Sequence, residues 1–316
     1  MSEPSDLPEL PSRGWRMALA VLARLPQGSL SRGFGRFADL PLPRPLRRPV
    51  LQSFSRLVGV DLTEVELPLE SYRTLNEFFV RRLRPGVRTW PQPADTLASP
   101  VDGAIGQTGR ITRGRVLQAK GRWYSVADLI GDDVEAERYE GGSFVTLYLS
   151  PRDYHRIHAP IGGTIPYARH IPGALLPVNA AAVAHVPHLF PRNERLLCAI
   201  DGRLGRVTVV AVGAYNVGRI SAAFDQDWHA GEGETRWVTN RGGGEPARHD
   251  YSPPISIERG EELMAFHLGS TVVLLLEPGR CELDPTLAAG RPVRLGMTLG
   301  RRIQGASGEE EVASSS

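Results

Sequence analysis

Short runs of β-branched and other apolar residues, separated by Gly and Pro, occupy much of the chain between residues 97 and 217, for example "GSFVTLYLS" and "RVTVVAVGA". Runs of this kind are typical of antiparallel strands, whereas a parallel sheet alternates its strands with helices. A further strand-like stretch, "ISIERGEELMAFHLGSTVVLLLEP", follows closer to the C-terminus. The sequence therefore predicts an α+β fold built on a mainly antiparallel β core.

The first 85 residues predict amphipathic helices instead. Residues 15–25 are almost wholly apolar. A second helix is expected to start at Pro49, because Pro suits the first turn of a helix. Its predicted apolar face comprises Val50, Leu51, Phe54, Leu57 and Val58. A third helix is expected to open at Thr74, with Glu77 at the spacing of a capping box.

Arginines flank these predicted helices. They are Arg44, Arg47 and Arg48 before the second helix, and Arg81, Arg82 and Arg84 at the end of the third. Two interpretations stay open. The helices could simply pack on the core, or their apolar faces could enter a membrane surface while the arginines pair with anionic lipid. We expect residues 1–85 to form a membrane-associating region.

Residues 86–304 are expected to form one β-rich domain. Within it, residues 231–254 are rich in Gly and charge and predict a mobile loop. The acidic, Ser-rich residues 305–316 predict a disordered tail. Neither of the common nucleotide-binding loops, G-x-G-x-x-G opening a helix or G-x-x-x-x-G-K, occurs. The formal net charge of +2 is too small to indicate nucleic-acid binding.

Cysteine usage and hydropathy bear on location. Cys198 and Cys281 are too few for a disulfide framework, and the first residues show no secretory signal pattern. No uncharged apolar run reaches the roughly 18 residues that span a bilayer. We therefore expect a peripheral protein on the cytoplasmic face of the cell membrane.

Two histidines, His155 and His158, follow a predicted strand in "YLSPRDYHRIHAP". They could be metal ligands, but a zinc site needs further ligands and neither cysteine lies in a metal-type motif. They could be a general acid and base, because histidine titrates near neutral pH. They could also be ordinary hydrogen-bonded histidines, and the local pattern leaves all three interpretations open.

Asp102 in "SPVDG" and Ser270 in "FHLGSTVV" are the other candidate site residues. Asp-Gly favours turns by itself, and a Gly at the mouth of a strand indicates a bulge or tight turn. Alternatively, Asp102 orients His158 and Ser270 is a nucleophile, as in a catalytic triad. No G-x-S-x-G motif surrounds the serine, which disfavours an α/β-hydrolase.

Four separated motifs, "SPVDG", "YLSPRDYHRIHAP", "LFPRNERLL" and "FHLGSTV", together resemble those of the bacterial-type phosphatidylserine decarboxylases. These are pyruvoyl-dependent lyases of phospholipid biosynthesis. The resemblance runs from about residue 51 to about residue 299, with the motifs in the order of the family. It implies an enzyme that converts phosphatidylserine to phosphatidylethanolamine.

The resemblance further implies a self-cleaving proenzyme, or zymogen. The Ser270 hydroxyl would attack the Gly269 carbonyl, and elimination and hydrolysis would then turn Ser270 into a pyruvoyl group, the covalent cofactor. Asp102 and His158 would form the base assembly for cleavage. His155 would donate the proton to the carbon that loses CO2. No metal is implied.

Decarboxylation of an amino acid needs an electron sink, which a pyruvoyl carbonyl joined to the substrate amine as a Schiff base supplies. A pyridoxal enzyme would need a lysine, and Lys120 is the only one. The implied partners are phosphatidylserine in the membrane and an anionic phospholipid surface. The cleaved large and small chains would stay associated because "VVLLLEP" is apolar. Family likeness also suggests a homodimer.

Two residues depart from the family pattern: His267, next to the cleavage motif, and Tyr215 in "VGAYNVG". Both are expected to affect how the lipid headgroup fits the site and how fast the reaction runs. Two other functions remain open. A serine hydrolase could use Ser270, His158 and Asp102 without cleavage, or the chain could be a non-catalytic lipid-binding protein. Either would keep an intact chain.

Overall fold

The computed structural model describes residues 38–91, 93–119, 121–214, 220–228, 244–267 and 271–303. Several sequence predictions fall outside these residues: those on residues 15–25, Lys120, Tyr215, residues 231–243, Gly269, Ser270 and residues 305–316. The predicted α+β class with mainly antiparallel strands is confirmed, because all the strand pairs in the four described sheets are antiparallel.

The helix predicted from Pro49 begins earlier, so that prediction was wrong. Helix α3 spans Arg44–Val58, carries a proline in its first turn, and ends at Gly59 with φ of 85°. Pro45 takes the early position where a missing N–H costs nothing, whereas Pro49 lies inside the helix. The residues of the predicted apolar face do not share one environment, because Leu51 is fully buried but Leu57 is 84% exposed.

Helix α4, Leu75–Phe79, confirms the predicted capping residues. The hydroxyl of Thr74 accepts from the backbone N–H of Glu77 at 2.9 Å, and the Glu77 carboxylate accepts from the N–H of Arg73. A short 3-10 helix, Leu69–Ser71, precedes it. These elements share a small hydrophobic cluster centred on Leu51 and Phe78.

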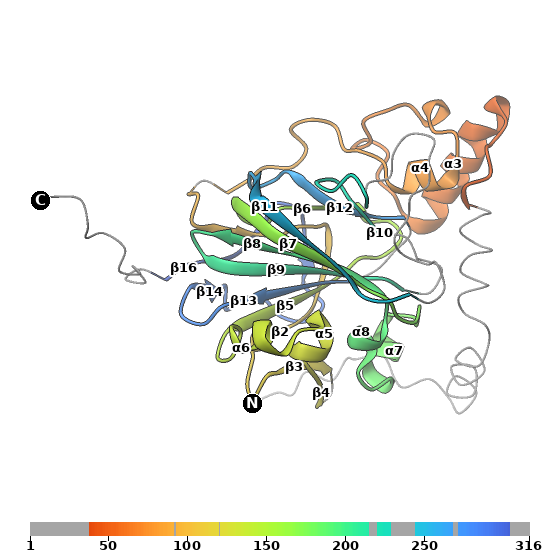
Figure 1. Ribbon diagram of the computed structural model, residues 1–316. Coiled ribbons are helices and arrows are strands. Elements are labelled where there is room, and N and C mark those ends of the chain that lie inside the picture. Colours follow the sequence, from red (N-terminus) through yellow and green to blue (C-terminus); the bar gives the residue numbers. More distant parts are fainter. Residues whose placement is uncertain are drawn as a thin grey trace, which may run out of the picture.

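An eight-stranded sheet forms the centre of the molecule, in the order β11-β7-β8-β9-β13-β5-β2-β15 (Figure 1). Its strands are β2 (Gly103–Arg110), β5 (Ser143–Tyr148), β7 (Gly163–Ile171), β8 (Arg195–Gly202), β9 (Gly205–Val212), β11 (Ala247–Ile257), β13 (Thr271–Leu276) and β15 (Pro292–Val293). The smaller sheets comprise β1 (Thr96–Ala98), β16 (Thr298–Arg302) and β14 (Cys281–Leu283), then β10 (Ile220–Ala222), β12 (Glu262–Phe266) and β6 (Arg156–His158), and the pair β3 (Arg115–Ala119) and β4 (Arg122–Ser125). The remaining helices are α5 (Val126–Ile130), α6 (Asp133–Glu137), α7 (Ala180–His185) and α8 (Leu189–Arg192).

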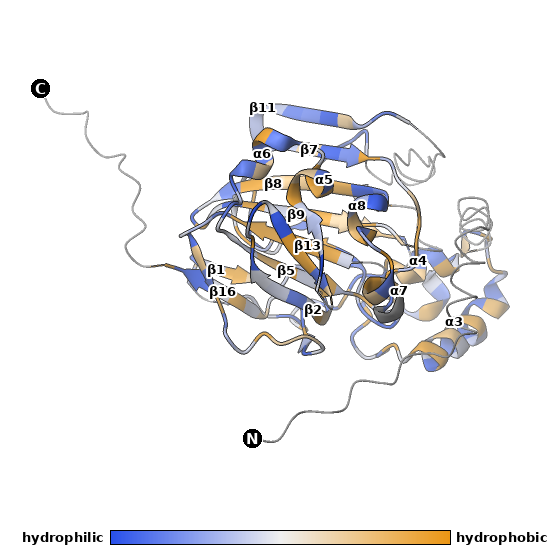
Figure 2. Cartoon of the chain, turned by 90° about the horizontal axis from the view of Figure 1, so that it is seen from below, coloured by the Kyte–Doolittle hydropathy of each residue, from blue (hydrophilic) through white to orange (hydrophobic). Residues whose placement is uncertain are grey.

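Two hydrophobic cores lie on opposite faces of this sheet. On β13, Val272, Leu274 and Leu276 enter one core, and Val273 and Leu275 enter the other, as the two-residue period of a strand requires. The first core lies between the large sheet and the sheet β10-β12-β6, and the second lies between the large sheet and helices α5 to α8 (Figure 1). Strands β9 and β13, in the middle of the sheet, are rich in apolar residues (Figure 2).

The mobile loop predicted over residues 231–254 is wrong from Ala247 onward. Residues Ala247–Ile257 form β11, the edge strand that pairs with β7. The pairing shifts register between Asp250 and Ile255, where Pro253 and Pro254 lie. Prolines and charges misled the sequence interpretation because both are well tolerated on an edge strand, where one side needs no ladder hydrogen bonds.

Two further expectations concern membrane spanning and cysteines. Within the described ranges, the helices are all too short or too polar to cross a bilayer. Cys198 and Cys281 are buried free thiols, as their small number suggested.

Candidate active site

The candidate site lies at one end of the central sheet. Thr271, the first residue of β13, pairs with Tyr148 at the end of β5, and Tyr148 pairs on its other side with Ala104 of β2. Since neighbouring strands lie about 4.8 Å apart, the starts of β13 and β2 are about 10 Å from each other. Asp102 and Ser270 immediately precede these two starts in the chain, although Ser270 itself lies outside the described residues.

The two histidines come from the segment that leaves β5. The N–H of Phe266, at the end of β12, donates to the carbonyl of His155 at 2.9 Å. His158 instead pairs with Glu262, at the start of β12. His155 is therefore level with the end of β12 from which the chain continues toward Gly269, and His158 is level with the opposite end.

His155 is completely buried. Its Nδ1 donates to the carbonyl of Asp153 at 2.8 Å, and its ring packs on Phe79 with centroids 4.1 Å apart. Burial lowers the pKa of His155 to about 3, helped by the nearby charge of Arg81 and opposed by the hydrogen bond to Asp153. The imidazole is therefore neutral at neutral pH. Its Nε2 has no hydrogen-bond partner among the described residues and is therefore available as a proton acceptor.

His158 has both ring nitrogens engaged. Its Nδ1 donates to the carbonyl of Gly260 at 2.7 Å, and the Tyr154 hydroxyl lies 3.1 Å from Nε2. Burial lowers its pKa, so this histidine is also neutral and accepts from Tyr154. Trp90 lies 6.1 Å from its ring, centroid to centroid.

Asp102 is held by Arg88 rather than by a histidine. Arg88 Nε and Nη2 donate to the two carboxylate oxygens at 3.0 and 2.5 Å, and the N–H of Leu295 donates to Oδ1 at 2.7 Å. Within the described structure no hydrogen bond joins Asp102 to His158; the backbone connects them, because the His158 N–H donates to the carbonyl of Pro100 at 2.9 Å. Sequence reasoning missed Arg88, which lies in a connection without any recognisable motif.

His267, the unusual neighbour of the cleavage motif, is buried and lies 3.1 Å from the Ser221 hydroxyl through its Nε2. Ser221 belongs to β10, so this contact ties the residue before the cleavage motif to the sheet β10-β12-β6. His267 thus helps to fix the end of β12.

The "LFPRNERLL" motif has a structural role. Asn193 bonds to both backbone groups of Leu176 and to the carbonyl of Gly213. Arg195, which is buried, donates to the carbonyls of Leu129, Pro191, Asn193 and Asp128. These contacts fasten the connection after β7 to helices α5 and α8.

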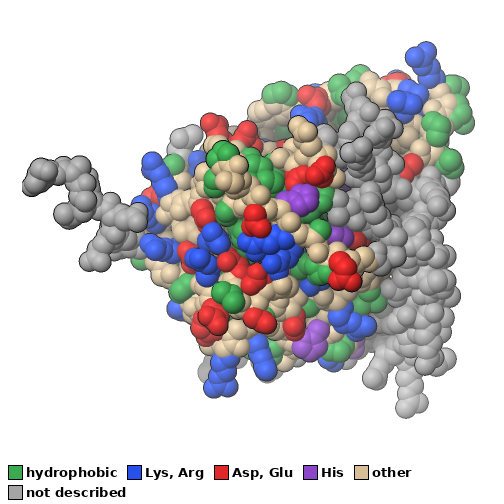
Figure 3. Space-filling view, viewed as in Figure 1, with side chains coloured by type: hydrophobic (Ala, Val, Ile, Leu, Met, Phe, Trp, Pro, Cys, Tyr) green, Lys and Arg blue, Asp and Glu red, His purple; other side chains and the backbone are tan. Residues whose placement is uncertain are grey.

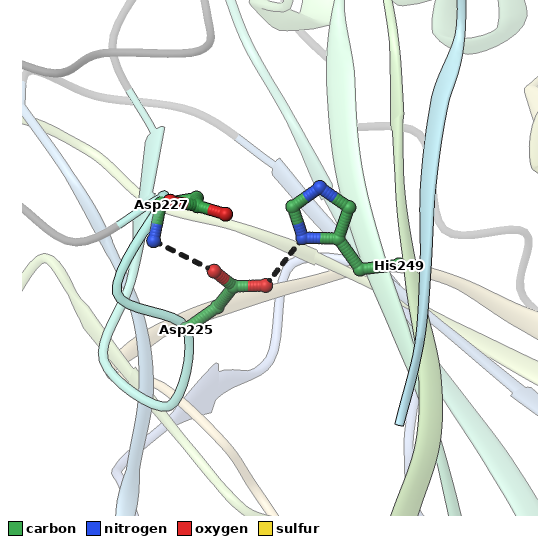
Figure 4. Close-up of side chains that lie close together, drawn as sticks. All are labelled: Asp225, Asp227 and His249. Carbon is green, nitrogen blue, oxygen red and sulfur yellow. Dashed lines mark hydrogen bonds and ion pairs between the residues drawn. The ribbon is translucent and has the colours of Figure 1, made fainter. Parts of the chain in front are cut away.

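Among the described residues, one group of His and Asp side chains is compact enough to hold a metal ion: Asp225, Asp227 and His249 (Figure 4). The buried Asp225 carboxylate already accepts from His249 Nδ1 at 2.7 Å, from the Tyr251 hydroxyl at 2.5 Å and from the Asp227 N–H at 2.9 Å. These hydrogen bonds fully account for the arrangement. The cluster ties residues 225–227 to strand β11.

Comparisons with known proteins identify the family of the chain. The sequence model of the phosphatidylserine decarboxylase family matches residues 75–301. The chain is 47% identical to the phosphatidylserine decarboxylase proenzyme of Anaeromyxobacter sp. (strain K), over 90% of this chain and 98% of that protein. It is 42% identical to the proenzyme of Myxococcus xanthus (strain DK1622), over 89% of this chain and 97% of that protein. The chain therefore belongs to the phosphatidylserine decarboxylase family, whose members are carboxy-lyases made as proenzymes and carrying a pyruvoyl group derived from serine.

Proposed function

We propose that this proenzyme matures by cleavage between Gly269 and Ser270, with the Ser270 hydroxyl as the nucleophile. The observation that carries the proposal is the geometry around that segment. Thr271 starts a strand at the same sheet edge as Asp102, and His155 is level with the end of β12 that leads into the segment. Asp102 and His155 therefore come from elements that end or begin near this segment, and His158 is joined to the segment before Asp102 through its hydrogen bond to the Pro100 carbonyl.

Asp102, His155 and His158 would share the proton transfers. A neutral His155 with a free Nε2 can take a proton from a group brought against it and return it to the carbon that loses CO2. His158, supported by Asp102, would serve cleavage. Because Tyr154 donates to His158 Nε2, this role requires the Tyr154 hydroxyl to move aside or to relay the proton.

The residues present fit a pyruvoyl group at position 270. Among the described residues, the hydroxyl of Thr271, which follows that position in the chain, and His155 Nε2 are buried polar atoms without a hydrogen-bond partner, as expected where a further polar group belongs. The group supplies an electron sink for the carbanion left by CO2. The chain's own task is to keep the site away from bulk water, and His155 is completely buried.

The two chains made by cleavage should stay together. Strand β13 lies between β9 and β5 in the middle of the large sheet, and all of its residues are buried. Removing it would expose both cores and leave two strand edges unpaired. The small chain is therefore held by the same contacts that hold the intact fold.

We further propose that α3 contacts the membrane that contains the substrate. Leu46, Val50 and Leu57 are 50%, 40% and 84% exposed, and at 100° per residue they fall within about 40° of one another on the helix. Arg44, Arg48 and Arg56 are exposed on the same helix. Figure 3 shows hydrophobic and basic side chains together at the upper right, where Figure 1 draws α3. This composition suits an interface with anionic lipid.

The deciding experiment is the intact mass of the denatured protein, measured beside a Ser270→Ala variant. Cleavage predicts two chains in the wild type, the smaller one starting at position 270 with the mass of an N-terminal pyruvoyl group, and one full-length chain in the variant. An intact, inactive wild-type chain would reject the proposal. If such a chain reacted with a serine-directed phosphonate, a serine hydrolase would replace it.

A further inference from the structure

A buried arginine lies beside His155 with part of its hydrogen-bonding capacity unused. Arg81 follows helix α4 and is 4% exposed. Its Nη2 donates to the carbonyls of Arg152 and Asp153 at 2.9 and 3.2 Å, and its guanidinium carbon lies 5.3 Å from the centre of the Phe78 ring. Its Nε and Nη1 have no hydrogen-bond partner.

Arg195 shows what a purely structural buried arginine looks like in this fold. It is 3% exposed, and its Nε, Nη1 and Nη2 all donate to backbone carbonyls. Arg81 is equally buried but uses only one of its three nitrogens. Leaving charged donors buried without partners is costly, and the described residues offer Arg81 no ion pair in compensation. The missing partner is expected to be an anion.

The side chain of Arg81 lies next to the side chain of His155. The carbonyl of Asp153 accepts from both Arg81 Nη2, at 3.2 Å, and His155 Nδ1, at 2.8 Å. The two side chains therefore meet at one oxygen. An anion bound by Arg81 would therefore lie in the neighbourhood of His155.

We propose that Arg81 binds the phosphodiester of the phosphatidylserine headgroup and thereby places the reacting carbon beside His155. The inference rests on the proposed function, because it assumes that phosphatidylserine is decarboxylated at this site. On either side of the planar guanidinium fork, the free Nε–H and Nη1–H groups can each donate a charge-assisted hydrogen bond to a phosphate oxygen. In the headgroup only an oxygen and a methylene group separate the phosphorus from the reacting carbon, so a short span joins the two residues.

The substrate carboxylate is the other possible anion, and the chemistry argues against it. Decarboxylation removes that negative charge as CO2 leaves, so an arginine bound to the carboxylate would stabilise the starting state more than the transition state. The phosphodiester keeps its charge throughout. An arginine bound to the phosphodiester therefore binds the substrate, the transition state and the product with similar strength.

The experiment compares Arg81→Gln and Arg81→Lys with the wild type, and uses Arg82→Gln as the matched control. Arg82 is the next residue, but its side chain is 65% exposed and it forms a 3.5 Å ion pair with Glu262. The assay measures kcat and KM on phosphatidylserine in neutral detergent micelles. It also measures inhibition by glycerophosphoethanolamine, which carries the phosphodiester but has no carboxylate.

The expected result for Arg81→Gln is a KM and an inhibition constant that both rise about 10- to 100-fold, with a smaller change in kcat. Arg81→Lys should recover part of the loss, because it keeps the charge without the fork, and Arg82→Gln should match the wild type. If KM rises while inhibition is unchanged, Arg81 binds the carboxylate and the proposal is overturned. If only thermal stability falls, Arg81 merely supports the segment that contains Arg152 and Asp153, and the proposal is equally overturned.

Maturation is checked separately, so that the two proposals can fail independently. An uncleaved wild-type chain would reject the proposed cleavage whatever Arg81 does. If only Arg81→Gln fails to mature, calorimetry of glycerophosphoethanolamine on Ser270→Ala and on Ser270→Ala/Arg81→Gln decides the question. Equal affinity of these two uncleaved chains would reject a role in phosphodiester binding.

Discussion

The guanidinium of Arg88 holds both carboxylate oxygens of Asp102, with Nε 3.0 Å from Oδ1 and Nη2 2.5 Å from Oδ2. The same Nη2 donates to Glu64 at 2.6 Å, and Glu64 also binds Arg294 at 2.9 Å. Two acids and two arginines thus form one network at the start of β2. This network fixes the direction of the Asp102 carboxylate and connects it to the N-terminal region through Glu64.

Replacing Arg88 by Gln should destabilise the protein by about 3–5 kcal/mol, because it leaves Asp102 without its buried ionic partner. Urea unfolding of the Ser270→Ala chain, with and without Arg88→Gln, measures this directly. Arg294→Gln is the matched control, since the Arg294 side chain is 69% exposed at the rim of the same network. A similar small loss for both variants would mean that Arg88 contributes only as a surface charge.

His155 should make the fold sensitive to acid. Its folded-state pKa of about 3 lies below the unfolded value of 6.5, so between these pH values the unfolded chain binds more protons. Stability attributable to this residue should therefore fall as pH drops from 6.5 toward 3, by about 1.4 kcal/mol per pH unit. The comparison is Ser270→Ala with Ser270→Ala/His155→Gln. Parallel curves of unfolding free energy against pH would contradict the assignment of a buried neutral histidine.

The exposed stripe on α3 should contribute to membrane binding. Leu57→Ser removes a side chain that is 84% exposed, so it should cost little folding stability but weaken binding to anionic liposomes about tenfold. Val134→Ser is the control: Val134 is 79% exposed on α6, at the opposite end of the molecule in Figure 1. Co-sedimentation measures both. If both variants lose liposome binding equally, or if neither loses any, α3 does not contact the membrane.

The Asp225 cluster should support the edge strand β11. Asp225→Asn weakens the acceptors of His249 and Tyr251 and should cost about 1–3 kcal/mol, with faster hydrogen exchange in β11. Asp227→Asn is the matched control, because Asp227 is exposed and only its backbone N–H takes part. Unchanged exchange in β11 after Asp225→Asn would show that the strand is held by its pairing with β7 alone.

Much of this fold follows from local patterns. Short runs of β-branched and other apolar residues predict β5, β9 and β13 correctly, and Thr74 with Glu77 gives the start of α4. The sequence predictions are wrong where the tertiary environment of a segment decides its structure more than its composition does. Residues 247–254 resemble a loop because of their charges and prolines, yet β7 offers them a sheet edge that accepts both.

The candidate site is harder to predict from the sequence than the fold is. The motifs identify Asp102, His155 and His158 as residues of interest, but burial and hydrogen bonding decide what each can do. Arg81 and Arg88 both stand outside the chemical motifs, in a chain whose positive charge is almost entirely arginine. Only the structure distinguishes them from the surface arginines, because Arg81 is buried against residues 152–153 and Arg88 is held by Asp102 and Glu64.

The position of β13 has a consequence for assembly. The proposed cut just before β13 would turn the contacts of this strand, in the centre of the sheet, into an interface between two polypeptides. That interface would be as extensive as the core itself. Neither polypeptide has a complete sheet alone, so two separately made pieces have no folded partner to recognise. We therefore expect the fold to form in the uncut precursor before cleavage, and we expect the separated pieces to refold poorly.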